Sequence, residues 1–277
     1  MIYLRLAGGL GNQLFQLAAA MHVSECTGQG IVPFTNALSR YAQRREPDSL
    51  RLFASERLFV PIPTLANKAL SWMVSTGRVG RWLPVFGLND RSLQPANCAQ
   101  LSGSLYAMDG YFQRGWSLPA FEGAMRRFQV AAIPFAAQNR LMKDECAIHI
   151  RGGDFLSHKL HQVVDVDYYV AALRSAHTVG WSKFAVLTDD LVHARTIVET
   201  MKHRLPGIEI RSVPPSNDAL ADFGILRAAP ARIIGNSTFA WWAAALDKDQ
   251  APTWSPSKFL LNVERDFFLN WEIQLAV

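Results

Sequence analysis

The chain has 277 residues, which is closer to two domains of ordinary size than to one. Hydrophobic residues make up 49% of the sequence and charged residues 18%, a balance that excludes intrinsic disorder. The formal net charge of +5 favours anionic ligands such as phosphate, but it is too small for a dedicated nucleic-acid binder. We therefore expect a folded protein of two domains that does not bind nucleic acid.

The cysteines and the N-terminus indicate where the protein works. Cys26, Cys98 and Cys146 are odd in number, far apart and never in a C-x-x-C pair, so they predict neither a disulfide framework nor a zinc site. The first residues lack the charged head and apolar core of a signal peptide, and no apolar run approaches the ~18 residues of a membrane span. We expect a cytoplasmic protein, either soluble or peripheral at the inner membrane face.

The first elements are a strand, a glycine turn and a helix. Residues 2–6 form a short β-type run, glycines follow at 8, 9 and 11, and apolar residues then recur at helical spacing from Asn12 to Cys26. Leu14 stands where the dinucleotide-binding fingerprint G-x-G-x-x-G needs glycine or alanine. The second candidate strand ends at residues 35–36 without the acidic residue that would bind a ribose. A nicotinamide cofactor is therefore disfavoured, and no other cofactor is indicated.

The glycine turn has two interpretations. Gly9, Gly11, Asn12 and Gln13 are candidate ligand-binding residues, because glycines let backbone N–H groups approach an anion at a helix N-terminus. Alternatively, Gly11 only permits a tight turn and Asn12 caps the helix.

The segment 57–89 also has two interpretations. It contains no acidic residue, and it carries basic and aromatic side chains without a clean period. It is either a helical insert whose aromatic residues fill a core, or a basic aromatic face that touches a membrane or a lipid-linked substrate.

A second α/β unit begins near residue 145. The strand Cys146–Arg151 is closed by Gly152-Gly153-Asp154, and helical and strand patterns then alternate. We expect helices at 167–177, 192–203, 219–228 and 239–246, and strands at 184–187, 208–213 and 232–234. This alternation predicts a parallel sheet covered on both faces. Two such domains, 1–140 and 141–277, would face a cleft at the carboxyl ends of their strands.

The strand that ends at Arg151 carries the strongest chemical signal. His149 and Arg151 point the same way in an extended strand, so the guanidinium lies at the carboxyl end, where its planar fork suits a phosphate. The alternatives are that Arg151 pairs with Asp154 across the turn and that His149 is a core residue.

Two further strand ends carry polar residues. Ser237 and Thr238, after Asn236, would cap the next helix or hold an anion there, while Trp241-Trp242 is a core pair or a sugar platform. Of the adjacent acids Asp189 and Asp190, one would cap a helix and the other could face a ribose. The chain has no Walker A loop and no metal-binding D-x-D at a strand end, so arginine and helix dipoles would carry the charge of a diphosphate.

Three blocks together resemble the signatures of the α-1,2-fucosyltransferases, glycosyltransferase family 11. They are Gly-Gly-Leu-Gly-Asn-Gln-Leu-Phe-Gln at 8–16, His-x-Arg-x-Gly-Asp-Phe at 149–155 and Asn-Ser-Thr-Phe-x-Trp-Trp at 236–242. Gly-Tyr-Phe-Gln at 110–113 and Asp-Tyr-Tyr at 167–169 are similar to family positions as well. Three blocks in this order are far more specific than any one of them.

The resemblance implies a GT-B type fold of two Rossmann-like domains, with an N-terminal acceptor side and a C-terminal donor side. It also implies inverting, metal-independent transfer of fucose from GDP-fucose to the 2-hydroxyl of a galactose-type residue. The acceptor would be a galactose-terminated oligosaccharide or a lipid-linked glycan.

Carried over by position, the resemblance assigns roles to single residues. Arg151 would clamp the β-phosphate, and Ser237 and Thr238, in the block with Asn236 and Phe239, would hold the diphosphate. His149 would lie beside the nucleotide, Asp222 would read guanine, and Asn12 with its glycine loop would close over the sugar phosphate. Asp190 completes the expected donor site.

One departure from the family pattern stands out. The family has a second arginine where this chain has Gly152, so donor binding is weaker unless a cation such as Lys159 substitutes. Alternatively, that second arginine serves folding rather than catalysis. The alternative function is therefore a GDP-sugar or glycan-binding protein with weak or lost transferase activity.

The base that accepts the hydroxyl proton is a separate question. Asp154 is the first candidate, with His158 and His161 in the same loop as fallbacks, and its alternative role is to hold the turn. A phosphate oxygen could also take the proton, without a protein base.

Overall fold

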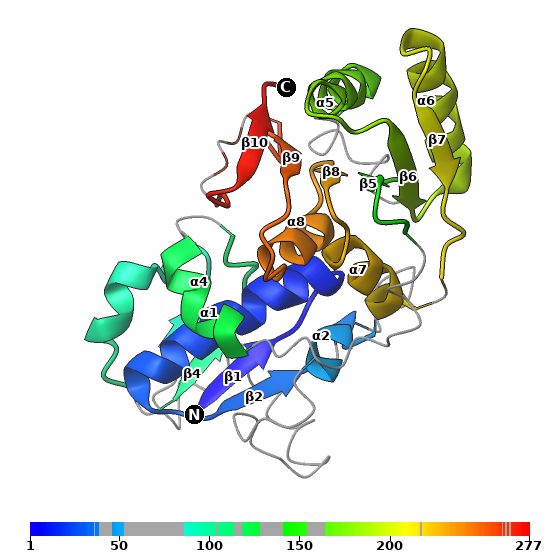
Figure 1. The fold of residues 1–277 in the computed structure, drawn as a ribbon. Helices are drawn as coiled ribbons and strands as arrows, with labels where there is room; N and C mark the ends of the chain where they lie inside the picture. The colour runs from blue at the N-terminus through cyan, green and yellow to red at the C-terminus, as the bar shows by residue number, and fades with distance from the viewer. Residues whose placement is uncertain are drawn as a thin grey trace. The chain divides into compact units, whose positions relative to one another are not determined.

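The computed structural model describes residues 1–35, 37–38, 46–52, 86–103, 105–113, 118–127, 141–153, 164–216, 218–261, 263, 265 and 267–277. The chain divides into two compact units, Met1–Ala132 and Ile133–Val277 (Figure 1). Each unit is built around its own parallel sheet.

Unit 1 contains a four-stranded parallel sheet in the order β2-β1-β4-β3. Its strands are β1 (Ile2–Arg5), β2 (Ile31–Phe34), β3 (Phe86–Leu88) and β4 (Tyr106–Met108). The helices are α1 (Leu10–Thr27), α2 (Asp48–Arg51), the 3-10 helix η3 (Pro95–Gln100) and α4 (Leu118–Arg127). The strand at 2–6 and the helix at 12–26 are thus confirmed within two residues of their predicted ends.

Helix α1 is the central helix of unit 1. It packs against β1, η3 and α4, so its residues are buried on almost every side, including the polar Gln13 and Gln16. A helix enclosed in this way is apolar around its whole circumference rather than along one stripe. It ends at Gly28, whose φ of 68° is the left-handed conformation that favours glycine after a helix.

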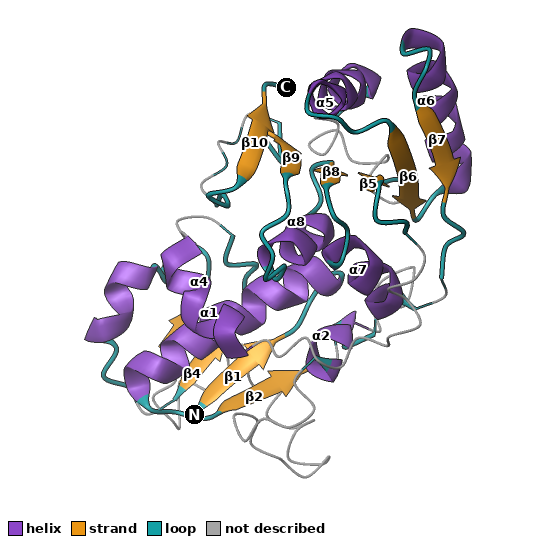
Figure 2. Cartoon of the chain, in the orientation of Figure 1, coloured by secondary structure: helices purple, strands orange, loops and turns teal. Residues whose placement is uncertain are grey.

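Unit 2 contains a six-stranded parallel sheet in the order β10-β9-β8-β5-β6-β7 (Figure 2). Its strands are β5 (Glu145–Ile150), β6 (Lys183–Thr188), β7 (Glu209–Ser212), β8 (Arg232–Ile234), β9 (Thr253–Pro256) and β10 (Glu272–Leu275). The helices are α5 (Val166–Thr178), α6 (Leu191–Arg204), α7 (Ala219–Arg227) and α8 (Thr238–Ala245). Counted from β5, this is the doubly wound order 3-2-1-4-5-6 read from the other edge.

The core of unit 2 explains why helices cover both faces of its sheet. Side chains of α5 and α6 pack on the strand face that carries Ile148, Ile150 and Val186. Helix α8 packs against β8 and α7, and its Trp241 and Trp242 are fully buried. The interpretation of this tryptophan pair as core is therefore confirmed.

Residues 53–85 lie outside the described residues, and with them most of the basic segment 57–89. The described part of that segment, residues 86–89, contains β3 at the edge of the sheet. No helix in the described ranges combines the length and hydropathy that a membrane crossing requires. The contact with a membrane surface stays a prediction.

Candidate functional site

The order in which strands are added to the parallel sheet of unit 2 reverses between β5 and β8. The chain proceeds from β5 to β6 on one side, and it returns to the other side of β5 at β8, where His149 lies opposite Ile234. The carboxyl ends of these two strands therefore bring residues 149–153 and 235–238 together. A topological switch point of this kind is where open α/β sheets bind ligands.

Gly235 lets the two strand ends approach each other. A Cβ at this position would lie 2.7 Å from the hydroxyl oxygen of Tyr169 and 3.7 Å from the carbonyl oxygen of His149. The Tyr169 hydroxyl donates to that carbonyl across 3.2 Å. Glycine is thus required here by space rather than by backbone conformation.

Arg151 leaves the end of β5 with its side chain only 21% exposed. Its guanidinium forms an ion pair with Asp189, which follows the neighbouring strand β6. The second carboxylate oxygen of Asp189 accepts from the backbone N–H of Gly152 across 2.8 Å. The alternative partner that the sequence suggests for Arg151 is Asp154. Asp154 lies outside the described residues, as do Lys159, His158 and His161.

Asp190 is the acid that caps a helix. Its carboxylate accepts from the backbone N–H groups of His193 at 3.0 Å and Gly153 at 3.1 Å, and these two bonds hold its pKa below the usual range. It stays ionised at the N-terminus of α6, where the helix dipole favours a negative charge. Of the two adjacent acids, Asp190 therefore caps and Asp189 engages the arginine.

Residues 152 and 153 are glycines for different reasons. Gly153 has a φ of 61°, a left-handed conformation that side chains rarely adopt. At Gly152 the backbone is ordinary, but a Cβ would overlap the Cβ of Asp190 and lie 3.0 Å from one of its carboxylate oxygens. The arginine that the family pattern expects at 152 therefore has no room unless Asp190 moves.

His149 is buried and uncharged. Its ring stacks on Phe239, with centroids 5.6 Å apart and planes 29° from parallel, and Phe239 in turn contacts Phe223 edge-on at 5.4 Å. Burial, and secondly the charge of Arg151, lowers the pKa of His149 to about 3. Within the described residues nothing hydrogen bonds to its Nδ1 atom.

Hydrogen bonds within unit 2 hold the second loop at the switch point, residues 235–238 after β8. Ser237 caps α8 by accepting from the N–H of Ala240 at 3.5 Å, and Asn236 donates its amide to the carbonyl of Phe259 at 3.0 Å. Both side chains are buried, whereas Thr238, the first residue of α8, is half-buried. The loop thus presents its helix N-terminus and one hydroxyl.

Asp222 lies in the first turn of α7, as predicted. It is half-buried, and its carboxylate accepts from the N–H of Ser216 at 3.2 Å. Its chain neighbour Phe223 contacts Phe239, which stacks on His149. Aromatic contacts therefore connect the helix that carries Asp222 to the end of β5.

The glycine turn of unit 1 has a different environment. Gly8 has a φ of 77°, and Gly9 stands at the start of α1 with open space around its Cβ position. Gln13 is 1% exposed, and its amide donates to the carbonyls of Gly8 and Glu46 at 3.1 and 2.9 Å. Its oxygen accepts from the Ser49 hydroxyl at 2.8 Å. Gly11 is buried within the first turn of α1.

A second strand end meets this turn. Gln113, from the Gly-Tyr-Phe-Gln block, donates to Asn12 at 2.9 Å, and Gln16 donates to the carbonyl of Gly110 at 3.0 Å. Asp90 accepts from the N–H groups of Tyr111 and Phe112 and so holds this loop after β4. Nothing in the sequence signalled Asp90, because no motif includes it.

Unit 2 is thus a doubly wound α/β fold with glycines at its switch point, and unit 1 is a second parallel α/β unit with a glycine turn after its first strand. The sequence model described as Glycosyl transferase family 11 matches residues 132–274, which is more than half of the chain. The chain belongs to this family of glycosyltransferases.

Three known proteins are similar to this chain, one in sequence and two in fold. The O-antigen biosynthesis glycosyltransferase WbnK of Escherichia coli is 24% identical over 278 residues, covering 89% of this chain and 90% of WbnK. The crystal structure of the α-1,6-fucosyltransferase NodZ with GDP gives a TM-score of 0.51 at 17% identity, covering 87% of this chain and 90% of NodZ. The structure of a mutant of Arabidopsis thaliana FUT1 in complex with GDP gives a TM-score of 0.53 at 14% identity, covering 92% of this chain and 69% of FUT1. The predicted fold class, GT-B with two Rossmann-like domains, is confirmed.

Proposed function

We propose that the protein transfers fucose from GDP-fucose to the 2-hydroxyl of a galactose-type residue of a glycan, with inversion and without a metal ion. One observation carries the proposal: Arg151 and the N-terminus of α8 meet at the switch point of unit 2. A guanidinium and a helix N-terminus are together suited to bind a diphosphate. NodZ and FUT1, whose fold this chain shares, were both solved with GDP.

In the proposed reaction the acceptor oxygen attacks C1 of fucose on the face opposite the diphosphate. The bond between C1 and the phosphate oxygen breaks, its electron pair leaves with GDP, and the acceptor hydroxyl gives its proton to a base. Arg151 would stabilise the charge that develops on the leaving diphosphate. Its guanidinium pairs with Asp189 through Nη1, so the phosphate would either bind the remaining N–H groups of Arg151 or displace that carboxylate.

The proton acceptor is proposed to be Asp154, with His158 and His161 as alternatives. His149 is unsuited to that role, because a pKa of about 3 leaves its imidazole a weak base. Its Nδ1 atom has no hydrogen-bond partner in the part of the chain that the structure describes, and this uncharged ring would instead give or accept a hydrogen bond beside the nucleotide.

Specificity for guanine is assigned to Asp222. A carboxylate accepts from both N1 and N2 of guanine, whereas adenine does not present that pair of donors. A site built in this way rejects the wrong base because its own polar group is left without a partner.

The two units would divide the substrates between them. Residues 141–277 would bind the donor, and residues 1–140 would bind a galactose-terminated oligosaccharide or a lipid-linked glycan. Asn12 and the glycine turn at 8–11 would close over the sugar phosphate, and the open space at Gly9 leaves its backbone approachable.

The proposal is tested with purified protein, GDP-fucose and a panel of galactose-terminated acceptors. We expect release of GDP with at least one acceptor, a product linkage at the 2-hydroxyl by NMR, micromolar GDP binding and much weaker ADP binding. A chelator should leave the initial rate unchanged. Activity abolished by EDTA and restored by a divalent ion would contradict the mechanism.

A second candidate function follows from Gly152 and Asp189. With no cation at 152 and Arg151 already paired, the site offers less positive charge than the family pattern provides. The protein would then bind a GDP-sugar or a glycan with weak or lost transfer. GDP binding without GDP release for any acceptor of the panel would favour this candidate.

A further inference from the structure

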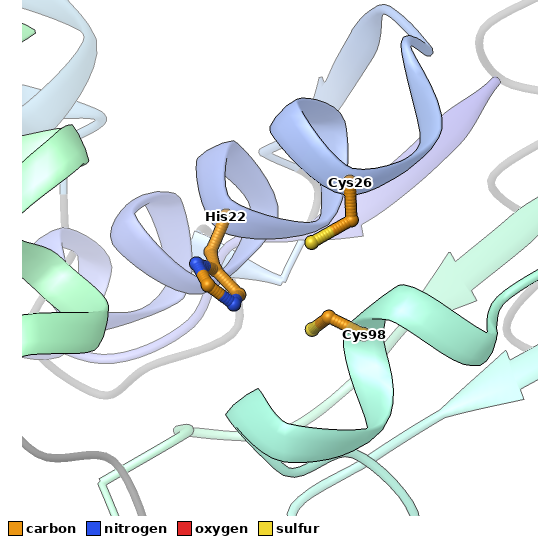
Figure 3. A group of neighbouring side chains, drawn as sticks. All are labelled: His22, Cys26 and Cys98. Atoms are coloured by element: carbon orange, nitrogen blue, oxygen red, sulfur yellow. The ribbon is translucent and has the colours of Figure 1, made fainter.

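Three side chains with metal-binding atoms meet in unit 1, away from the motifs described so far. His22 and Cys26 lie one turn apart on α1, and Cys98 lies on η3, which packs against that helix (Figure 3). One ligand atom from each residue lies within 4.8 Å of the other two. Sequence spacing gave no sign of this group, because Cys98 lies 72 positions after Cys26.

The chemistry of the group favours a thiophilic metal. Two thiols and one imidazole are the ligands that Zn²⁺ accepts, whereas Mg²⁺ and Ca²⁺ require oxygen atoms. Zinc bonds of about 2.0–2.3 Å place neighbouring ligand atoms roughly 3.5 Å apart in a tetrahedron. To bind the ion, the three atoms, which lie within 4.8 Å of one another, must approach to that spacing.

The surroundings of the group allow a metal to enter and to be held. Cys26 is exposed, His22 is half-buried and Cys98 is 1% exposed, so the group runs from solvent to the interior. Burial, and secondly the neighbouring Cys26, raises the pKa of Cys98 to about 12, and its thiol donates weakly to the Gln94 carbonyl at 3.8 Å. A bound dication would replace that proton.

We propose that His22, Cys26 and Cys98 form a Zn²⁺ site with three protein ligands and one open position. The ion would connect the C-terminal half of α1 to η3 and so stabilise unit 1. Its ligands are absent from the proposed donor site, and His22 lies twelve positions beyond the start of α1, about 18 Å along the helix axis. Zinc should therefore raise thermal stability without taking part in transfer.

The test uses the untagged full-length protein, kept reduced with a phosphine. Titration with Zn²⁺ should show one equivalent bound and a rise in the melting temperature. Co²⁺ as a probe should give the near-ultraviolet charge-transfer absorption of thiolate ligands. His22→Gln and Cys26→Ser change surface-accessible side chains and should weaken binding by at least the roughly 10–100-fold that loss of an outer-shell partner costs.

The matched control is His203→Gln, which alters an exposed histidine of α6 in unit 2. It should bind Zn²⁺ as the wild type does. Equal affinity for Zn²⁺ in His22→Gln, Cys26→Ser and the control would overturn the proposal. Cobalt binding without thiolate absorption would overturn it as well. A Cys26–Cys98 disulfide in the isolated protein, together with no zinc binding after reduction, would identify the pair as a redox couple instead.

Discussion

Units 1 and 2 begin with the same local arrangement, a buried strand, a glycine turn and a helix, and use it differently. In unit 1 the polar side chains after the glycines bond inward, as Gln13 does to Gly8, Glu46 and Ser49. In unit 2 the strand end carries Arg151, which pairs with Asp189, and His149, whose Nδ1 atom has no hydrogen-bond partner among the described residues. The glycine turn alone therefore does not define a binding site. The two strand ends differ in the chemistry of the side chains beside the turn, an inward-bonded amide at Gln13 and a guanidinium at Arg151.

The largest expected effect comes from the proposed base in unit 2. Asp154→Asn preserves the shape of the side chain but removes its ability to accept a proton. Transfer should fall by roughly 10²–10⁴, while GDP affinity stays within a few-fold of wild type. Initial rates and calorimetric titration measure the two quantities. Weaker GDP binding or a lower melting temperature would instead indicate that Asp154 holds the turn, and unchanged transfer would remove it from the mechanism.

A slightly smaller loss of transfer rate is expected when Arg151, the arginine at the end of β5 in unit 2, is replaced. Arg151→Lys should be nearly as damaging as Arg151→Ala, because lysine keeps the charge but cannot offer two parallel donors to a phosphate. The rate of GDP release should fall by roughly 10²–10³, by analogy with loss of an oxyanion donor.

The matched control for this pair of variants is Arg195→Lys, on the exposed surface of α6. It should retain wild-type activity. If Arg151→Lys also kept most of the activity, the guanidinium would serve only as a counter-charge.

Because the side chain of Gln13 bonds to protein groups within unit 1, its replacement should lower the stability of the fold. Gln13→Leu leaves buried partners such as the Ser49 hydroxyl without their hydrogen bonds, which should cost about 2–3 kcal/mol of unfolding free energy. Denaturant unfolding measures this cost, with Gln100→Leu as an exposed control in the same unit. GDP affinity should change little. Lost GDP affinity at unchanged stability would show that Gln13 contacts the donor.

The smallest effect is a pH dependence that arises from His149. Its folded pKa of about 3 lies below the unfolded value of about 6.5, so below pH 6.5 the unfolded state binds the extra proton. Stability is therefore lost as the pH falls, by about 2 kcal/mol between pH 7 and pH 5. The comparison of unfolding without nucleotide in wild type, His149→Phe and the control His203→Gln tests this. Equal pH slopes in all three proteins would contradict the burial of an uncharged imidazole.

Sequence analysis predicted the fold well where hydrophobic periodicity was strong. The strands and helices between residues 145 and 246 occur in the predicted order, because a buried parallel strand and an amphipathic helix leave clear patterns. It missed β9 and β10, four-residue strands that follow the last predicted helix. Short strands next to irregular chain carry too few residues for a period to appear.

The candidate site was predicted less completely, because pairing across strand ends depends on sheet order. The sequence indicated Arg151, but only the β5–β6 pairing brings Asp189 to it. It likewise indicated the glycine turn of unit 1, but two partners of Gln13, Glu46 and Ser49, lie more than 30 positions away. Asp90 and the group of His22, Cys26 and Cys98 were invisible for the same reason.

The contact between Gly152 and Asp190 has an evolutionary consequence. Since a Cβ at 152 would overlap Asp190, and Asp190 also caps α6 and holds the N–H of Gly153, neither position can change independently. The two residues form an epistatic pair. A side chain at 152 would require Asp190 to give up this cap or the loop to take another course, so Gly152→Arg alone should destabilise unit 2. Gly152 thus limits the positive charge that can be placed at this end of β5.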